Sequence, residues 1–283
     1  TRNAAAELAK RINEAAVVNP VNLIALALLA TPKHTADEHA LQRMIVHYQA
    51  LLREAPYAPT TIPCPLDAQQ VVTYAERLAV VERFADPLGD LIRVRDEQAP
   101  LLAYFLNNVL HVFALPALVA CLLSHNRRLD AARVTRAVSG ICALMRAELF
   151  LRWPPGELEA ATEAVIRVLL ARGLLCRSPT SGRLAAPEPI SQEFAELHLL
   201  GETIRPLLER HFLALALLDR QGSGQLTRQA LGDNCHLLAQ RLSLLYEFNT
   251  PEFPEKATFS ASIRLAMKAE KVAVSGNAGG VNS

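Results

Sequence analysis

The sequence predicts a mainly α protein with short β-hairpins. Its repeated helix-helix-hairpin units are winged-helix-like and are linked by long apolar helices. Apolar residues recur at helical intervals over most of the chain, and pairs of short apolar runs flank turns after the helices. Leucine pairs also recur at Leu28–Leu29, Leu122–Leu123 and Leu217–Leu218, with spacings of 94 and 95 residues. A period this long indicates a repeated small domain rather than a solenoid unit.

The composition is that of a protein with a sizeable core and balanced charge. Hydrophobic residues make up 51% of the chain and charged residues 20%, and 29 basic residues face 28 acidic ones for a net charge of +1. A protein that coats nucleic acid carries a strong basic excess. We therefore expect no nucleic-acid partner.

The rest of the chain is organised around the apolar stretch Ala99–Leu123, which contains no Asp, Glu, Lys or Arg. A helix of this composition is apolar on almost every side and must be buried. A transmembrane span is the alternative, because a bilayer requires about 20 apolar residues. Asn107, Asn108 and His111 interrupt the stretch and leave Val112–Leu123 uninterrupted, so we favour a buried central helix over residues 96–128.

The chain begins with an apolar lead-in helix over residues 1–34, which we expect to be interrupted at Pro20 because proline removes a backbone donor. The first helix-helix-hairpin unit follows over residues 35–95. Thr35 is expected to cap its first helix, because Glu38 stands at the spacing of a capping box.

The second helix of this unit is expected to start after Asp67, a residue type that caps helices. The short apolar runs Val80–Phe84 and Leu91–Val94 then flank a turn at Asp86–Gly89. This pattern predicts a β-hairpin.

The second unit spans residues 129–188 and repeats the same order. Its expected helices are Asp130–Phe150 and Glu157–Ala171, and Gly173 provides a C-terminal stop for the second of them. A second hairpin is expected around the turn Ser178–Gly182.

A third apolar helix is expected over residues 189–224, capped by Ser191 and bent at Pro206. An incomplete third unit then covers residues 225–274. Residues 275–283 have the composition of a disordered tail.

Two helices and a hairpin are also the outline of a DNA-binding module, whose second helix places basic or amide side chains in the major groove. Here the second helices begin with DAQQ at Asp67 and with GELEAATE at Gly156, which is acidic where a phosphate would lie. We therefore retain the fold resemblance and reject DNA binding.

Catalytic signatures are scarce in this sequence. One tempting pattern is the His-x4-Asp formed by His125 and Asp130, because an aspartate can orient a histidine that deprotonates an alcohol. Asp130 is explained more simply as a helix cap and Arg127 and Arg128 as solvated loop charges. We interpret the pattern as a chance match; a complete enzyme that uses His125 is the alternative.

The sequence predicts no metal site and no cofactor. His34 and His39 lie five residues apart, which does not place two ligands on one helix face. The odd number of cysteines and the absence of C-x-x-C favour reduced core thiols of a cytosolic protein. These cysteines are Cys64, Cys121, Cys142, Cys176 and Cys235.

Two further residues are interpreted as structural, His111 as a hydrogen-bonded buried histidine and Trp153 as a packing anchor. A group of arginines allows a basic surface for lipid phosphate, although scattered solvated charge is the simpler interpretation. The group is Arg146, Arg152, Arg205, Arg210 and Arg241.

Several strings occur together in one order. They are RINEAAVVNPVNLIALALLATP at Arg11–Pro32, LLREAPYAP at Leu51–Pro59, PLGDLIRV at Pro87–Val94, YFLNNVLHVFALPALVACLL at Tyr104–Leu123, RAELFLRW at Arg146–Trp153 and AQRLSLLYEFNTPEFPEKATF at Ala239–Phe259. Together they resemble the carboxy-terminal part of the bacterial membrane-associated glycerol-3-phosphate acyltransferases, the PlsB family.

The resemblance implies phospholipid biosynthesis: transfer of an acyl group from acyl-CoA or acyl carrier protein to sn-glycerol 3-phosphate, giving lysophosphatidic acid. It also implies a peripheral location at the cytoplasmic face of the bacterial inner membrane. The family's catalytic His-x4-Asp dyad and phosphate-binding blocks stand upstream of RINEAA and are absent here. No catalytic role is therefore transferred to His125 or Asp130.

From the resemblance we expect a carboxy-terminal scaffold or regulatory region that is inactive alone. Its expected partners are a catalytic acyltransferase domain upstream of residue 1, acyl carrier protein and the membrane surface. The start at Thr1 rather than methionine agrees with this expectation. The alternative is a non-catalytic winged-helix-like protein-interaction module.

Overall fold

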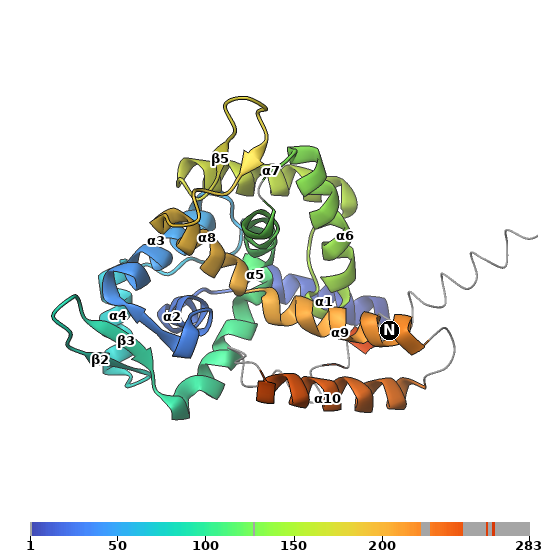
Figure 1. Cartoon of the computed structure of the whole chain (residues 1–283), viewed down its shortest axis with the longest axis horizontal. Coiled ribbons are helices and arrows are strands. Elements are labelled where there is room, and N and C mark those ends of the chain that lie inside the picture. The colour runs from blue at the N-terminus through green and yellow to red at the C-terminus, as the bar shows by residue number, and fades with distance from the viewer. Residues whose placement is uncertain (1, 127, 222–226, 246–258, 260–261, 264–283) are drawn as a thin grey trace, which may run out of the picture. The chain divides into compact units, whose positions relative to one another are not determined.

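The computed structural model is mainly helical with small antiparallel sheets, as predicted (Figure 1). It describes residues 2–126, 128–221, 227–245, 259 and 262–263. The chain divides into two compact units, Thr1–Ile204 and Arg205–Ser283, which are taken in turn below.

Unit 1 begins with helices α1 (Arg2–Glu14) and α2 (Pro20–Leu29). The interruption predicted at Pro20 is confirmed, because proline occupies the first position of α2, where no backbone donor is needed. The side chains of Asn19 and Asn22 form a capping box with the backbone at this helix start. Every residue of α2 after Pro20 is buried.

The central helix α5 (Ala99–His125) confirms the buried helix predicted from the apolar stretch. Its residues Val109–Ala120 are all buried, and it packs against α2 and α8 (Gln192–Glu202). Among the described residues, this is the one helix long and apolar enough to cross a membrane, and 72% of its apolar window is buried in the protein. Its first turns differ, because Leu101 and Tyr104 are exposed.

Within unit 1, the segment predicted as the first helix-helix-hairpin unit, residues 35–95, contains the predicted hairpin and also a third strand. Its elements are η1 (Pro32–His34), β1 (Thr35–Asp37), α3 (Glu38–Glu54), α4 (Ala68–Arg77), β2 (Val81–Phe84) and β3 (Leu91–Val94). The three strands pair antiparallel in the order β1-β3-β2.

The strand β1 corrects the predicted helix cap at Thr35. Thr35 pairs with Arg93 of β3, so the helix begins later. Asp37 caps α3 instead, accepting a hydrogen bond from the Ala40 amide at 2.9 Å. The cap predicted at Asp67 is confirmed, with Gln70 completing a capping box.

The segment predicted as the second helix-helix-hairpin unit, residues 129–188, also lies in unit 1, and its sheet has the same strand order. After the short turn η2 (Asp96–Gln98) and α5 come β4 (Arg128–Leu129), α6 (Ala131–Leu149), α7 (Pro155–Ala171), β5 (Cys176–Arg177) and β6 (Leu184–Ala185). Its sheet has the order β4-β6-β5 and is antiparallel.

The range 189–224, expected as one helix bent at Pro206, contains two helices. Ser191 caps α8, as predicted, and the next helix is α9 (Arg205–Gln221). The break falls before Pro206 because proline is accommodated in the first turn of a helix, where its missing N–H costs nothing.

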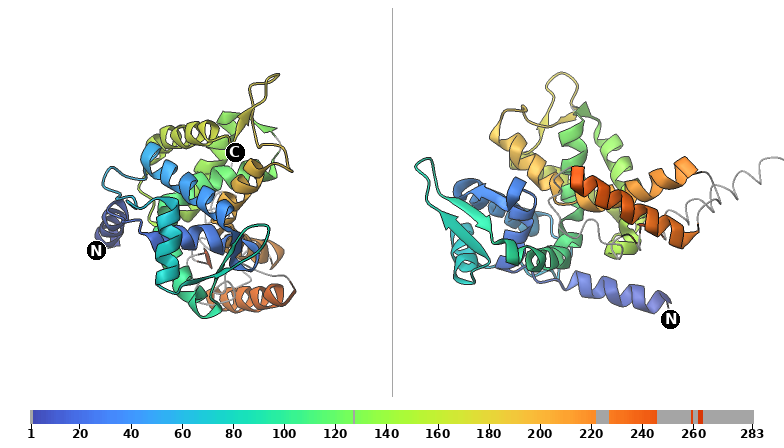
Figure 2. Two further views of the ribbon diagram at one scale, coloured as in Figure 1. Left: turned by 90° about the vertical axis from the view of Figure 1, so that its left-hand side faces the viewer. Right: turned by 60° about the horizontal axis from the view of Figure 1, so that its bottom comes forward.

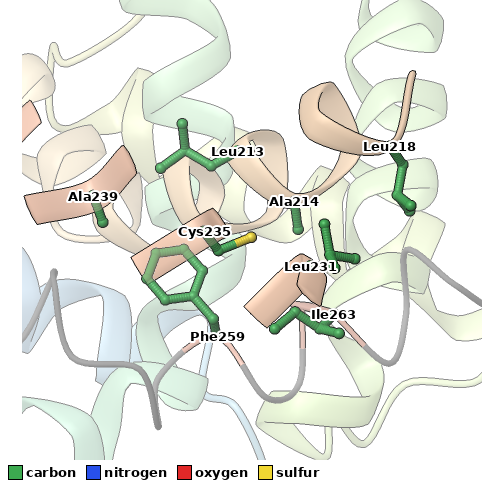
Figure 3. Packing of buried hydrophobic residues seen from close by; sticks show 8 residues of the cluster. All are labelled: Leu213, Ala214, Leu218, Leu231, Cys235, Ala239, Phe259 and Ile263. Atoms are coloured by element: carbon green, nitrogen blue, oxygen red, sulfur yellow. The ribbon is translucent and has the colours of Figure 1, made fainter. Parts of the chain in front are cut away.

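Unit 2 contains α9 and α10 (Arg228–Leu245), which pack against each other around a small apolar core. Figure 3 shows this core: Leu213, Ala214, Leu218, Leu231, Cys235, Ala239, Phe259 and Ile263. Most of the predicted third unit, residues 225–274, and the tail 275–283 lie outside the described residues.

Helices α4 and α7 end in the same way, and one of the two ends is strained. The Val80 amide reaches the Ala75 carbonyl at 3.2 Å, and the Leu174 amide reaches the Leu169 carbonyl at 2.9 Å, as in a Schellman motif. The left-handed residue is Gly173 (φ 73°) in one case and Ala79 (φ 55°) in the other. A side chain is unfavourable in this conformation.

We therefore expect Ala79→Gly to raise the free energy of unfolding by about 0.5 to 1 kcal/mol, because glycine removes the left-handed strain. The opposite exchange, Gly173→Ala, is expected to lower it by about 1 kcal/mol. Urea denaturation of both variants measures these changes. A lower free energy of unfolding for Ala79→Gly than for the wild type would show that the left-handed backbone of Ala79 is not strained.

Candidate functional site

A hollow of about 460 Å³ lies where the α1–α2 connection, α5 and the end of α6 meet. We call it the asparagine hollow. Its polar lining is Asn13, Asn19, Asn22, Asn107, Asn108, His111 and Glu148, and its larger apolar residues are Ile12, Val17, Phe105, Val109, Leu149 and Phe150. These residues come from parts of the chain that are far apart in sequence.

Hydrogen bonds hold the walls of the asparagine hollow together. The Asn13 side chain donates to the Leu149 carbonyl at 2.8 Å, and the Asn13 carbonyl accepts from His111 Nε2 at 3.1 Å. The Asn22 side chain donates to the Phe105 carbonyl at 2.7 Å. The end of α1 is thereby tied to α5 and α6, and the start of α2 to α5.

His111 is buried and hydrogen-bonded, as predicted. Burial lowers its pKa below the ordinary value, and the hydrogen bond to the Asn13 carbonyl opposes this only in part. The ring is therefore neutral at pH 7, and its Nε2 proton is donated to a carbonyl oxygen. These features are those of a structural histidine.

The polar lining of the asparagine hollow consists of amide side chains, one neutral imidazole and one carboxylate, that of Glu148. None of its lining residues in the described structure is lysine or arginine. A phosphate ester is normally bound by basic side chains or by helix N-termini. Among the described lining residues, the hollow therefore offers no basic side chain to a phosphate ester.

His125 and Asp130, the residues of the His-x4-Asp pattern, have different partners. His125 Nδ1 donates to the Cys121 carbonyl at 2.9 Å, at the end of α5. Asp130 accepts from Arg183 Nε at 2.9 Å and stands at the N-cap of α6, without a side-chain capping bond. The interpretation of the pattern as a chance match stays a prediction.

Trp153 is a packing anchor, as predicted. It is buried, and its ring meets that of Tyr57 edge to face with centroids 4.8 Å apart. Arg146 donates to the Trp153 carbonyl at 2.7 Å, and Arg152 pairs with Glu14 at 3.2 Å. These two arginines of unit 1 therefore hold the chain in place, whereas Arg205, Arg210 and Arg241 belong to unit 2.

The five cysteines are free. Burial raises the pKa of Cys142 to about 12 and that of Cys235 to about 11, so neither is a thiolate nucleophile at pH 7. His34 lies in η1 and His39 in α3. Within the described part of the chain, no group of three or more His, Cys, Asp or Glu residues is placed to hold a metal ion.

A charged cluster around the buried Glu196 was missed from sequence. Glu196 of α8 accepts from Arg43 Nε at 2.7 Å and from His47 Nε2 at 2.8 Å, both on α3. Arg172, after the end of α7, donates to His47 Nδ1 at 3.3 Å. Glu196 and Arg43 are 153 residues apart, so no local pattern could have revealed this pairing.

The ionisation of Glu196 follows from these contacts. Burial would raise its pKa, but the hydrogen bonds from His47 and Arg43 and the charge of Arg43 outweigh burial and lower the pKa below the ordinary value. The carboxylate is therefore charged at pH 7. The cluster joins α3, α8 and the end of α7, and we assign it a structural role.

Comparison with known proteins gives consistent matches. Residues 1–274 match the family model described as "Glycerol-3-phosphate acyltransferase C-terminal region". The "Glycerol-3-phosphate acyltransferase" of Pseudomonas paraeruginosa (strain DSM 24068 / PA7) is 38% identical over 255 residues, which are 90% of this chain and 30% of that protein.

Two other relatives with the same name give similar figures. The protein of Pseudomonas putida (strain GB-1) is 38% identical over 261 residues, which are 92% of this chain and 31% of that protein. The protein of Pseudomonas savastanoi pv. phaseolicola (strain 1448A / Race 6) is 36% identical over 252 residues, with coverages of 89% and 30%. The chain thus spans about 30% of the length of the curated relatives it matches.

Proposed function

The chain belongs to the glycerol-3-phosphate acyltransferase family, as its C-terminal region, and from this premise we propose that it is a non-catalytic scaffold for the acyltransferase reaction. In that reaction an acyl group passes from acyl-CoA or acyl carrier protein to the 1-hydroxyl of sn-glycerol 3-phosphate. The chain supports the part of the enzyme that performs this step.

The observation that carries the proposal is the lining of the asparagine hollow. Although large enough for a small substrate, it has no lysine or arginine for a phosphate group among its described lining residues. The side chains of His125 and Asp130 are bonded to other groups. A supporting role explains a large apolar core without reaction chemistry better than an active site does.

The proposal includes the arrangement of the fold and its surroundings. The shared strand order of the two sheets and the matching ends of α4 and α7 support a duplicated winged-helix-like unit. The partner is the acyltransferase part of the same enzyme, with acyl carrier protein as a further partner. The location is the cytoplasmic face of a bacterial inner membrane.

An assay with acyl-CoA and labelled glycerol 3-phosphate tests the proposal. We expect residues 1–283 alone to form no lysophosphatidate above background, whereas the full-length enzyme forms it. Deletion of this region from the full-length enzyme is expected to abolish turnover. Turnover by the region alone, or full activity after its deletion, would contradict the scaffold role.

A variant distinguishes the alternative of a complete enzyme. His125→Ala in the full-length protein is expected to leave turnover unchanged, because His125 binds a carbonyl at the end of α5. If this substitution abolishes turnover while the unfolding midpoint stays the same, His125 is catalytic and the proposal is wrong.

A further inference from the structure

Several large apolar side chains are exposed together at the amino-terminal end of unit 1. Leu8 and Ile12 of α1 are 60% and 63% exposed, and Val17 and Ile62 are 56% and 55% exposed. We call these residues, together with Phe105, the amino-terminal apolar face. Single exposed apolar residues are ordinary, but a contiguous patch marks an interaction site.

The members of this face are continuous with one another. Leu8 and Ile12 stand four residues apart on one side of α1. Val17 forms a parallel backbone bridge with Ile62. Ile12, Val17 and Phe105 all line the asparagine hollow, which therefore adjoins the face.

Helix α1 is held in place at its carboxyl end. The bonds of Asn13 lead to α5 and α6, and the Glu14 carbonyl accepts from Thr60 at 2.6 Å. From there α1 extends away from the other helices of unit 1 (Figure 2). A helix of this length is marginal in water unless its apolar side is packed.

We infer that the amino-terminal apolar face is the docking surface for the acyltransferase part that the relatives carry outside this region. The inference rests on the proposed function. The matched region is 30% of a relative, so about 70% lies elsewhere, and the matching family model is described as C-terminal. In a relative of this kind, the part of the chain that precedes the matched region is connected to the amino-terminal end of α1, beside this face.

The lining of the asparagine hollow favours a polypeptide over a lipid surface. The exposed Asn108 supplies an amide group that can pair with the backbone of another segment. A helix that lies on a membrane is rich in Lys and Arg on its polar side and carries large apolar residues. In α1 the charges are mixed, as the exposed pair of Arg11 with Glu7 illustrates.

Hydrogen exchange in the full-length enzyme tests this inference. In the wild type we expect the amides of α1 to be protected. In the double variant Leu8→Glu/Ile12→Glu we expect them to exchange at least about tenfold faster, because the packed side is lost. The matched control is Leu88→Glu/Ile190→Glu, since these side chains are 97% and 101% exposed; this variant is expected to leave α1 unchanged.

Protection of the α5 amides in the same samples reports that unit 1 is folded in each variant. Equal exchange of α1 in the wild type and the double variant, with α5 protected, would overturn the inference. Protection that appears only with phosphatidylethanolamine–phosphatidylglycerol vesicles would instead assign the face to a membrane. Protection that depends on protein concentration would assign it to a second copy of the chain.

This result is separable from the deletion experiment. If deletion of the region abolishes turnover but α1 exchanges freely, the scaffold role stands and this docking surface is wrong. If deletion leaves turnover intact, the scaffold role itself fails.

Discussion

Replacement of Gly201 by alanine is expected to lower the free energy of unfolding of unit 1 by about 3 kcal/mol, because overpacked helix contacts cannot relax easily. Gly201 lies on α8, where this helix crosses α5. A methyl group at this position would lie 2.9 Å from both the Cα and the backbone N of Cys121. Backbone atoms cannot rotate aside, so the two helices must separate.

The matched control is the same exchange at Gly140 of α6. A Cβ there meets no atom within 4 Å, and we expect Gly140→Ala to raise the free energy of unfolding by about 0.5 to 1 kcal/mol through helix propensity. Urea denaturation of the two variants therefore gives opposite signs. A loss below about 1 kcal/mol for Gly201→Ala would show that α5 and α8 are less tightly packed than described.

Substitution of Glu196 by alanine is expected to lower the free energy of unfolding by about 2 kcal/mol, in the range found when a buried donor loses its hydrogen-bond partner. His47 is buried and would keep an Nε2 proton without its acceptor. Glu163→Ala, at an exposed site on α7, is the control and is expected to change stability by less than about 0.5 kcal/mol.

The pH dependence gives a second measurement of the Glu196 cluster. Because the folded pKa is below the ordinary value of 4.5, the contribution to stability is fully present above that value. It is lost as the pH falls through the folded pKa. The difference in unfolding free energy between wild type and Glu196→Gln should therefore shrink on acidification. A difference that stays constant from neutral to acid pH would show that the charge of Glu196 does not stabilise the fold.

Local sequence patterns predicted the elements whose signals are local. The uncharged stretch of α5, the cap at Asp67 and the stop at Gly173 each depend on neighbouring residues. The strands β1 and β4 were missed because each is three residues or shorter and pairs with a distant partner. So short a strand has no periodicity to detect.

The candidate site was less predictable than the fold. Asn107 and Asn108 were noticed only as interruptions of an apolar helix, and Asn19 was not predicted as a site residue. The asparagine hollow forms because α1, α5 and α6 meet, and the bonds of Asn13 that join them span 98 and 136 residues. Only the folded chain brings these groups together.

The double attachment of Asn13 has a mechanical consequence. Its side chain is bonded to the end of α6 and its carbonyl to α5, so α1 cannot roll about its axis without breaking both bonds. The carboxyl end of α1 is therefore held rigidly against α5 and α6. A domain packed on α1 would keep a fixed orientation relative to α5 and α6. A torque on that domain would be transmitted to both helices.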